Sequence, residues 1–141
     1  MRRKLSAFVV LCVAMLAVGC VASTAQRADN FQPLTVSFEW DGNAGTLSSP
    51  NPEIHVANIP DGTAFLEVKM SDAHRPGFNH GGGIVPYTGS PVIPVGALRS
   101  YKGPQPPAPE VHSYTFTVRA LNQDKTILLG EGRATRKYPE K

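Results

Sequence analysis

The chain has 141 residues, which is enough for one domain, since a single hydrophobic core typically takes about 100–150 residues. Hydrophobic residues make up 41% and charged residues 18%, a composition that excludes a disordered tail and a protein with several membrane spans. The 13 glycines and 13 prolines follow no fixed period, which excludes collagen and favours short strands joined by turns.

The N-terminal end has the pattern of a secretory signal peptide. Arg2, Arg3 and Lys4 precede an apolar run over 5–18, and as a helix this run would span about 20 Å, short of the roughly 30 Å hydrocarbon core of a bilayer. We therefore expect residues 1–19 to be an export signal and not a permanent anchor. Without its three cations, 11 basic residues face 11 acidic ones, so the net charge of +3 disappears and nucleic acid is excluded as a partner.

The signal ends in Leu16-Ala17-Val18-Gly19-Cys20, which resembles a bacterial lipobox. The resemblance implies that Cys20 is acylated and becomes the new N-terminus, and several acyl chains anchor a protein stably. Cys12 lies inside the signal, so the exported chain would have a single thiol and no internal disulfide. The alternative is a soluble export signal that is cut near Ser23-Thr24-Ala25.

The residues after the cysteine predict where the protein is held. The residue after Cys20 is Val21 and not Asp. We therefore expect a lipid-anchored protein of the bacterial cell envelope that is held at the outer membrane, on its periplasmic side. Residues 20–33 are small and polar, and we interpret them as a lipidated tether. Residues 34–141 then form one domain.

Alternating apolar and polar residues predict β-strands along this domain. Candidate strands cover residues 35–40, 53–56, 64–70, 112–121 and 126–133. The last two are joined by the turn sequence Asn122-Gln123-Asp124-Lys125 and predict a hairpin. No stretch of twelve residues shows helical spacing free of glycine and proline. We therefore predict an all-β, single-domain β-sandwich of two small sheets.

A long region over 71–111 is broken by glycine and proline throughout, and loops of that length in a compact domain are usually functional. Its chemistry-bearing residues are Asp72, His74 and His80, and His112 follows it directly. Three of the four histidines therefore lie in this region or beside it. The run Gly81-Gly82-Gly83 predicts backbone crowding or positive φ angles.

Several short motifs occur in a fixed order along the domain. They are Asn51-Pro52-Glu53-Ile54, Ile59-Pro60-Asp61-Gly62-Thr63, Met70-Ser71-Asp72-Ala73-His74, Gly77-Phe78-Asn79-His80, Gly103-Pro104-Gln105-Pro106-Pro107 and His112-Ser113-Tyr114. Their order and spacing resemble the phosphatidylethanolamine-binding proteins, also called Raf kinase inhibitor proteins, and in particular their short bacterial members. The resemblance implies the β-sandwich of that family without its C-terminal helices, for which there is no room between Leu121 and Gly130.

The resemblance also implies a small pocket that binds phosphate or another anionic or phosphorylated group without a metal, a cofactor or catalysis. Carried over by position, its ligand-binding residues are Asp72, His80, Gly103, Pro104, Pro106, His112 and Tyr114. Such a set suits an anion, because imidazoles and a phenol donate hydrogen bonds, a loop adds backbone N–H groups, and a carboxylate keeps a histidine cationic. Some members of the family inhibit kinases or proteases, but nothing in this sequence identifies a protein partner.

The sequence departs from the family pattern at four positions. Val56, Met70, Gly81 and Ser113 stand where the family has Trp, Asp, Trp and Arg. We therefore expect a pocket that is less polar and more open. The alternative function is a structural or protein-interaction β-sandwich lipoprotein with a vestigial pocket, which meets a partner through a sheet edge or the proline-rich loop 103–109.

Two enzymatic interpretations of the same residues are weaker. His80-Gly81-Gly82-Gly83 matches the oxyanion-hole motif of esterases, but the nucleophile motif Gly-x-Ser-x-Gly is missing. Asp72, His74, His80 and His112 include the ligand types of a zinc site, but at generic spacing. We therefore expect that the protein is not an enzyme and binds no metal.

Overall fold

The computed structural model describes residues 24–140, and these form two β-sheets. The strands are β1 (Gln26–Pro33), β2 (Thr35–Phe38), β3 (Ile54–Ala57), β4 (Phe65–Asp72), β5 (Gly82–Pro86), β6 (Val92–Ile93), β7 (His112–Leu121) and β8 (Ile127–Tyr138). The expected signal peptide and the acylated Cys20 lie outside the described residues. Within residues 24–140 there is no helix, and so none that could cross a membrane.

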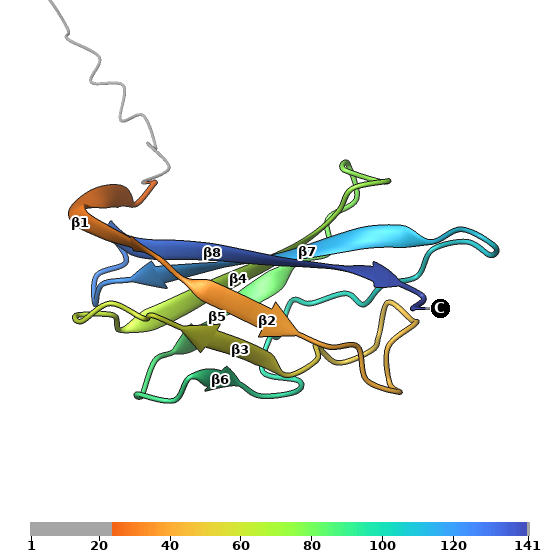
Figure 1. The fold of residues 1–141 in the computed structure, drawn as a ribbon, viewed down its shortest axis with the longest axis horizontal. Helices are drawn as coiled ribbons and strands as arrows, with labels where there is room; N and C mark the ends of the chain where they lie inside the picture. Colours follow the sequence, from red (N-terminus) through yellow and green to blue (C-terminus); the bar gives the residue numbers. More distant parts are fainter. Residues whose placement is uncertain (1–23, 141) are drawn as a thin grey trace, which may run out of the picture.

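The larger sheet has the order β1-β8-β7-β4-β5 (Figure 1). The predicted hairpin of β7 and β8 is confirmed: Val118 lies opposite Gly132, and the turn closes with Lys125 in the left-handed region at φ 57°. β4 pairs antiparallel with β7, so that Val68 lies opposite Val118 and Asp72 opposite Tyr114. Because side chains alternate along a strand, this register puts the apolar residues of all three strands on one buried face.

The smaller sheet, β2-β3-β6, covers that face and completes the predicted β-sandwich. Phe38 of β2 contacts Phe116 of β7 edge to face at 4.8 Å between ring centroids, which joins the two sheets. The core residues less than a tenth exposed are Leu34, Phe38, Ile54, Val56, Leu66, Val68, Met70, Ile93, Leu98, Tyr114, Phe116, Val118 and Ala120. The all-β prediction is therefore confirmed.

The segment expected to be a tether differs from that expectation. Residues 26–33 form β1, which pairs in parallel with β8 at the edge of the larger sheet. Two glycines of β8 allow this close approach: a Cβ on Gly130 would lie 2.6 Å from the carbonyl oxygen of Gln32, and one on Gly132 would lie 2.4 Å from that of Leu34. Residues 26–33 are therefore part of the folded domain, which begins before residue 34.

The long region over 71–111 is also more ordered than a single loop. It contains β5, which pairs with β4, and the short β6, which pairs with β3. β6 has only two residues, and β5 begins with two glycines and ends in proline, so neither strand shows an alternation in the sequence. The loop that precedes β5 and the segment that leads into β7 lie at the end of the sandwich where β7 begins, whereas the β5–β6 loop lies at the other end (Figure 1).

Candidate functional site

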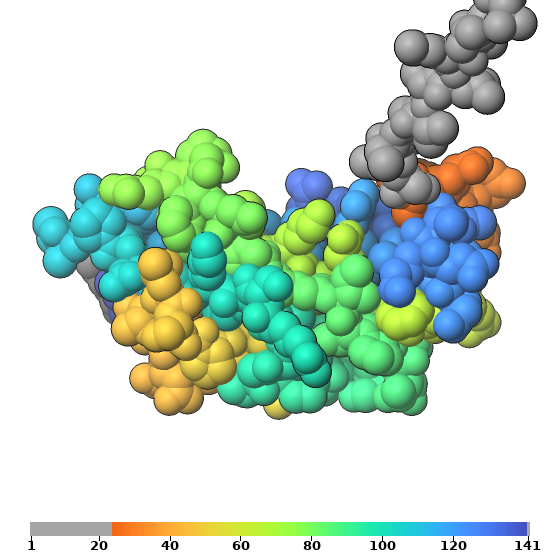
Figure 2. Space-filling model, turned by 180° about the vertical axis from the view of Figure 1, so that it is seen from behind, coloured from red at the N-terminus to blue at the C-terminus, as the bar shows by residue number. Residues whose placement is uncertain are grey.

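Segments that are far apart in the sequence meet at the end of the sandwich where β4 ends and β7 begins. In Figure 2 the amber, green and blue-green segments gather at this end, and the orange β1 lies at the other. They enclose a cavity of about 170 Å³ that is lined by Leu47, Asp72, Arg75, Phe78, His80, Gln105, His112 and Tyr114. A cavity of about 150 Å³ holds one molecule the size of benzene, so this one suits a single small ligand.

The polar centre of the site is a chain of three ionisable side chains. The buried His112 donates from Nδ1 to Oδ2 of Asp72 at 2.7 Å and from Nε2 to Oε2 of Glu110 at 2.8 Å. Carboxylate oxygens only accept hydrogen bonds, so both ring nitrogens carry protons and His112 is an imidazolium. Oδ1 of Asp72 accepts the backbone N–H groups of His74 and Arg75 at 2.8 Å and 3.2 Å.

These contacts shift the pKa of both buried partners. The hydrogen bonds to Glu110 and then to Asp72 raise the pKa of His112 above the ordinary imidazole value, although burial acts in the opposite direction. Burial alone would raise the pKa of Asp72, but the hydrogen bonds from His112 and from the backbone N–H of His74 hold it below the ordinary carboxyl value. The charged forms of both residues are therefore favoured.

His80 is buried on the other side of Asp72 and is held by a backbone contact. Its Nδ1 donates to the carbonyl oxygen of Lys102 at 2.9 Å, and the backbone N–H of Lys102 donates to the carbonyl of His80 at 2.8 Å. The other ring nitrogen, Nε2, lies 3.9 Å from Oδ2 of Asp72, beyond hydrogen-bond distance. His80 therefore presents this nitrogen toward Asp72 with no direct partner.

Tyr114 is fully buried between the two histidines. Its ring lies edge-on to His80 at 5.3 Å and roughly parallel to His112 at 6.1 Å, both between ring centroids. Burial first, and then the negative charge of Asp72, raise the pKa of the Tyr114 phenol well above its ordinary value. The phenol therefore keeps its proton and can donate a hydrogen bond.

The structure brings four of the predicted site residues together and leaves three aside. Asp72, His80, His112 and Tyr114 all line the cavity. Gly103, Pro104 and Pro106 are not part of its lining, and Gln105 from the same loop takes their place. The backbone N–H of Gly103 donates to Leu47 at 3.2 Å and is not free for a ligand.

Gly81 does not open the pocket, contrary to the expectation from its replacement of a tryptophan. It has φ of 68°, and a Cβ there would lie 1.7 Å from the carbonyl oxygen of Ser100. Gly82 likewise has a positive φ, at 149°. The predicted crowding at the glycine run is confirmed, and backbone occupies the space beside His80.

Sequence reasoning missed two charged residues at the site. Arg75 lines the cavity and forms no salt bridge with any carboxylate of the described residues. Glu110 contacts His112 and keeps 57% of its side chain exposed. The spacing Glu-x-His was the only available signal for Glu110, and it also occurs at Glu53, where it pairs with an exposed histidine.

The structure also bears on the zinc alternative. Asp72, His74 and His112 place one possible ligand atom each within 4.8 Å of one another. Three possible ligand atoms have hydrogen-bond partners: Oδ1 of Asp72 accepts the backbone N–H of His74 at 2.8 Å, Nδ1 of His112 contacts Oδ2 of Asp72 at 2.7 Å, and Nδ1 of His74 accepts the backbone N–H of Ser113 at 3.2 Å. The rings of His74 and His112 stack within 14° of parallel, so their nitrogens do not point to one common position. A metal ion at this place would therefore have to break these hydrogen bonds and turn the rings.

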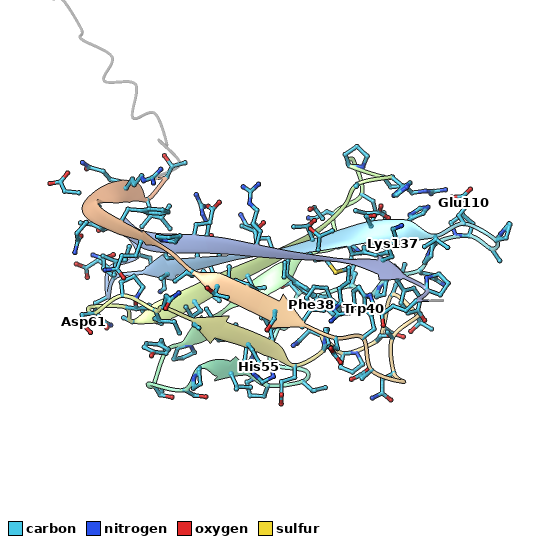
Figure 3. All side chains as sticks on the ribbon, in the orientation of Figure 1. Phe38, Trp40, His55, Asp61, Glu110 and Lys137 are labelled. Carbon is cyan, nitrogen blue, oxygen red and sulfur yellow. The ribbon has the colours of Figure 1, made fainter. Side chains whose placement is uncertain are left out.

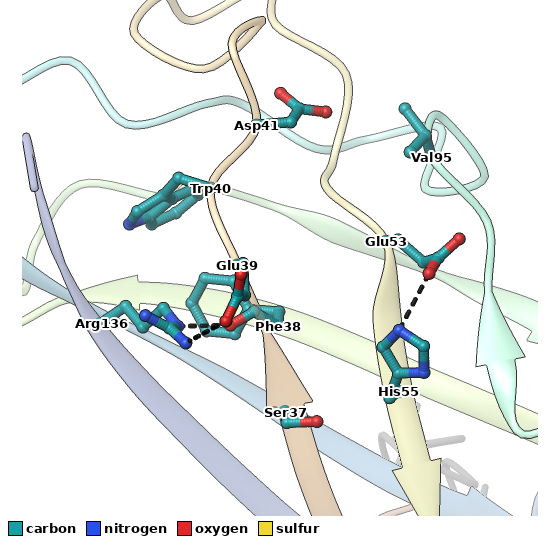
Figure 4. A pocket seen from close by; sticks show the side chains of 9 residues that line it. All are labelled: Ser37, Phe38, Glu39, Trp40, Asp41, Glu53, His55, Val95 and Arg136. Carbon is teal, nitrogen blue, oxygen red and sulfur yellow. Dashed lines mark hydrogen bonds and ion pairs between the residues drawn. The ribbon is translucent and has the colours of Figure 1, made fainter.

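A second, more open hollow of about 600 Å³ lies on the outer face of β2 and β3 (Figure 4). It has charged walls, and most of those charges pair with one another: Arg136 binds Glu39 at 3.0 Å and Glu53 binds His55 at 2.9 Å. The indole N–H of Trp40 donates to the carbonyl of Lys137 at 2.8 Å. This hollow lacks the buried donors of the first cavity, and we place the candidate site at the first.

Comparison with solved structures assigns the chain the fold of the phosphatidylethanolamine-binding proteins, the class that the sequence motifs resemble. YbcL of E. coli, a member of the mammalian PEBP family, aligns with a TM-score of 0.55 at 17% identity, over 78% of this chain and 100% of YbcL. The PEBP homologue CT736 of Chlamydia trachomatis aligns with a TM-score of 0.53 at 13% identity, over 77% of this chain and 99% of CT736. No family model and no curated protein match the sequence.

Proposed function

We propose that this protein belongs to the phosphatidylethanolamine-binding family and is a non-enzymatic binder of a small anionic or phosphorylated ligand. The observation that carries the proposal is the cavity itself, where buried His80, His112 and Tyr114 line the same space as the cation of Arg75, which has no salt bridge among residues 24–140. The guanidinium of Arg75 offers five N–H donors, a geometry that suits carboxylate and phosphate oxygens. Asp72 does not repel the ligand strongly, because three hydrogen bonds already neutralise its charge.

The size and chemistry of the cavity favour binding over catalysis. At about 170 Å³ it is smaller than the roughly 300 Å³ at which pockets for drug-sized ligands begin. Its lining has no serine or cysteine that a neighbouring base could activate as a nucleophile. A phosphate group or a small head group fits both properties.

We further propose that the protein is exported and held in the cell envelope by acyl chains on Cys20. The support is the sequence pattern of 1–20, which joins a basic start, an apolar run and a lipobox-like ending. The proposed partners are therefore a small anion and, through the anchor, a membrane. No protein partner is proposed.

A titration followed by NMR tests the anion-binding proposal. Inorganic phosphate or phosphoethanolamine added to the purified protein should shift the imidazole signals of His80 and His112 at millimolar concentrations and leave those of the exposed His55 unchanged. Arg75→Gln should weaken binding about tenfold, because it removes a charge-assisted hydrogen bond. Arg99→Gln, which makes the same charge change outside the cavity lining, is the matched control. Unchanged spectra at millimolar ligand would refute the proposal.

One observation favours the alternative of a protein-interaction module. β5 is an edge strand of the larger sheet, and its Ile84 is 47% exposed. In that case His80→Ala and His112→Ala would leave function in cells intact, and Ile84→Lys would abolish it. The opposite pattern supports the pocket.

A further inference from the structure

The contact between Glu110 and His112 bears directly on how the pocket is filled. His112 has two N–H donors, and both are in use: Nδ1 donates to Asp72 and Nε2 donates to Glu110. His112 therefore lines the cavity but has no donor left for a ligand while Glu110 is in place. A bound anion can be held by His112 only if one of these two carboxylates leaves.

Of the two carboxylates, only Glu110 is free to leave. Asp72 has a side chain that is 2% exposed and accepts two backbone N–H groups besides His112. The Glu110 side chain is 57% exposed, and its contact with Nε2 of His112 is its one hydrogen bond among the described residues. Rotation of this side chain into solvent therefore breaks a single contact and exposes the Nε2 donor.

The same rotation changes the charge of the site. With Glu110 in contact, the carboxylates of Asp72 and Glu110 balance the cations of His112 and Arg75. With Glu110 turned away, one carboxylate faces two cations, and the local charge is positive. An anion that enters then takes the place of the Glu110 carboxylate beside the two cations.

We propose that Glu110 is a built-in competitor, which occupies the anion position on His112 and must be displaced by the ligand. This inference rests on the proposed function, because it describes how the same pocket is regulated. The need to displace Glu110 lowers the apparent affinity of every anion by one common factor. The factor is common because the fraction of protein in which Glu110 contacts His112 before binding is the same for every anion. Glu110 thereby keeps weak anions out of the site.

The sequence offers a matched control for the contact between Glu110 and His112. Glu53 and His55 have the same Glu-x-His spacing and a contact of similar length, 2.9 Å, but both side chains are more than half exposed and lie on β3 or just before it. Glu53→Gln therefore repeats the charge change of Glu110→Gln away from the pocket. Both substitutions preserve the size of the side chain.

The experiment measures phosphate and acetate binding to the wild type, Glu110→Gln and Glu53→Gln, after thermal unfolding has shown that each variant is folded. We expect Glu110→Gln to tighten binding of both anions about tenfold and Glu53→Gln to change neither, since a half-exposed charge-assisted hydrogen bond is worth about one factor of ten.

A gain in affinity for phosphate that clearly exceeds the gain for acetate would overturn the proposal. Such a difference would indicate repulsion at a distance, which acts more strongly on a dianion than on a monoanion. Equal or weaker binding by Glu110→Gln would also overturn it, yet the wild-type titration would still support the proposed function. If none of the three proteins binds either anion, the proposed function fails and the competitor fails with it.

A measurement on the unsubstituted protein covers the case in which the variant does not fold. The carboxylate ¹³C signal of Glu110 should move when phosphate saturates the wild type, and that of Glu53 should not. A Glu110 signal that stays in place while the His112 signals shift would show that the ligand binds beside Glu110 without displacing it.

Discussion

The residue that decides the chemistry of the site is His112. It lies at the start of β7 and is buried, so its protonated form is stable only because two carboxylates accept its N–H groups. The native pKa of His112 is raised above the unfolded value of 6.5. The native state therefore holds a proton that the unfolded chain releases once the pH exceeds 6.5.

The difference between the native and unfolded pKa of His112 predicts that the free energy of unfolding falls as the pH becomes alkaline. The contribution of His112 is fully present below its unfolded pKa of 6.5 and is lost as the pH rises through its native pKa, with a slope of at most about 1.4 kcal/mol per pH unit for one proton. Urea unfolding in buffers from about pH 6 to pH 9 measures it. His112→Gln should remove this slope, and the exposed-site variant His55→Gln should retain it. An identical pH profile for wild type and His112→Gln would contradict the assignment.

At the scale of elements, the site depends on how the segment before β5 is held. His80 is tied to Lys102 by two hydrogen bonds, and the next residue, Gly81, packs against the backbone of Ser100. The backbone N–H of Met70 on β4 donates to the carbonyl of Gly81 at 3.0 Å. The position of the His80 ring is therefore set by contacts between three separate segments of the chain.

Gly81→Ala should disturb this arrangement, and Gly77→Ala should not. The new Cβ at position 81 would lie 1.7 Å from the carbonyl oxygen of Ser100, on a backbone with φ of 68°, but nothing lies within 4 Å of a Cβ at position 77. We expect a loss of about 2–4 kcal/mol in the free energy of unfolding for Gly81→Ala and a change below about 0.5 kcal/mol for Gly77→Ala. Urea unfolding compares the two, and equal effects would refute the crowding seen at Gly81.

At the scale of the whole molecule, β1 and the candidate site lie at opposite ends. β1 pairs with β8 beside the β7–β8 turn, whereas the site surrounds the start of β7, and the ten residues of β7 span about 30 Å between them. Glu110 and Asp61 mark the two ends in Figure 3. Five residues separate Cys20 from β1, a reach of at most about 22 Å. In a lipid-anchored protein the site would therefore face away from the membrane that holds it.

Lipid attachment itself is tested by substitution of the two cysteines. Cys20→Ser should abolish incorporation of radiolabelled palmitate in cells, because the thiol is the acyl acceptor in our proposal. Cys12→Ser, inside the expected signal, should leave labelling unchanged. Continued labelling of Cys20→Ser would show that the acylation site has been assigned to the wrong residue.

Much of the fold follows from the sequence because local alternation encodes it. The strand that contains Val118 and Phe116, its hairpin with β8 and the existence of β4 were predictable, since an alternating segment with one apolar face has few other ways to bury that face. The pairing of β4 with β7 came only from the structure. β1 was not predictable, because its residues are mostly exposed and show no alternation. It is held by parallel pairing with a strand about a hundred residues away. The only signal of this pairing in the sequence is the spacing of Gly130 and Gly132, which leaves room for the approach of β1.

For the candidate site, the sequence by itself determined which residue types gather. The motifs indicated four of the residues that line the cavity, Asp72, His80, His112 and Tyr114, but not Arg75 or Gln105. Only the tertiary structure decided what these residues do to one another. Nδ1 of His112 lies 2.7 Å from Asp72, Glu110 takes the remaining donor, and Arg75 lines the cavity without a salt bridge among the described residues. The physical reason is that hydrogen bonds and charge act over a few ångströms, and the register of β4 on β7 brings residues forty positions apart to that distance.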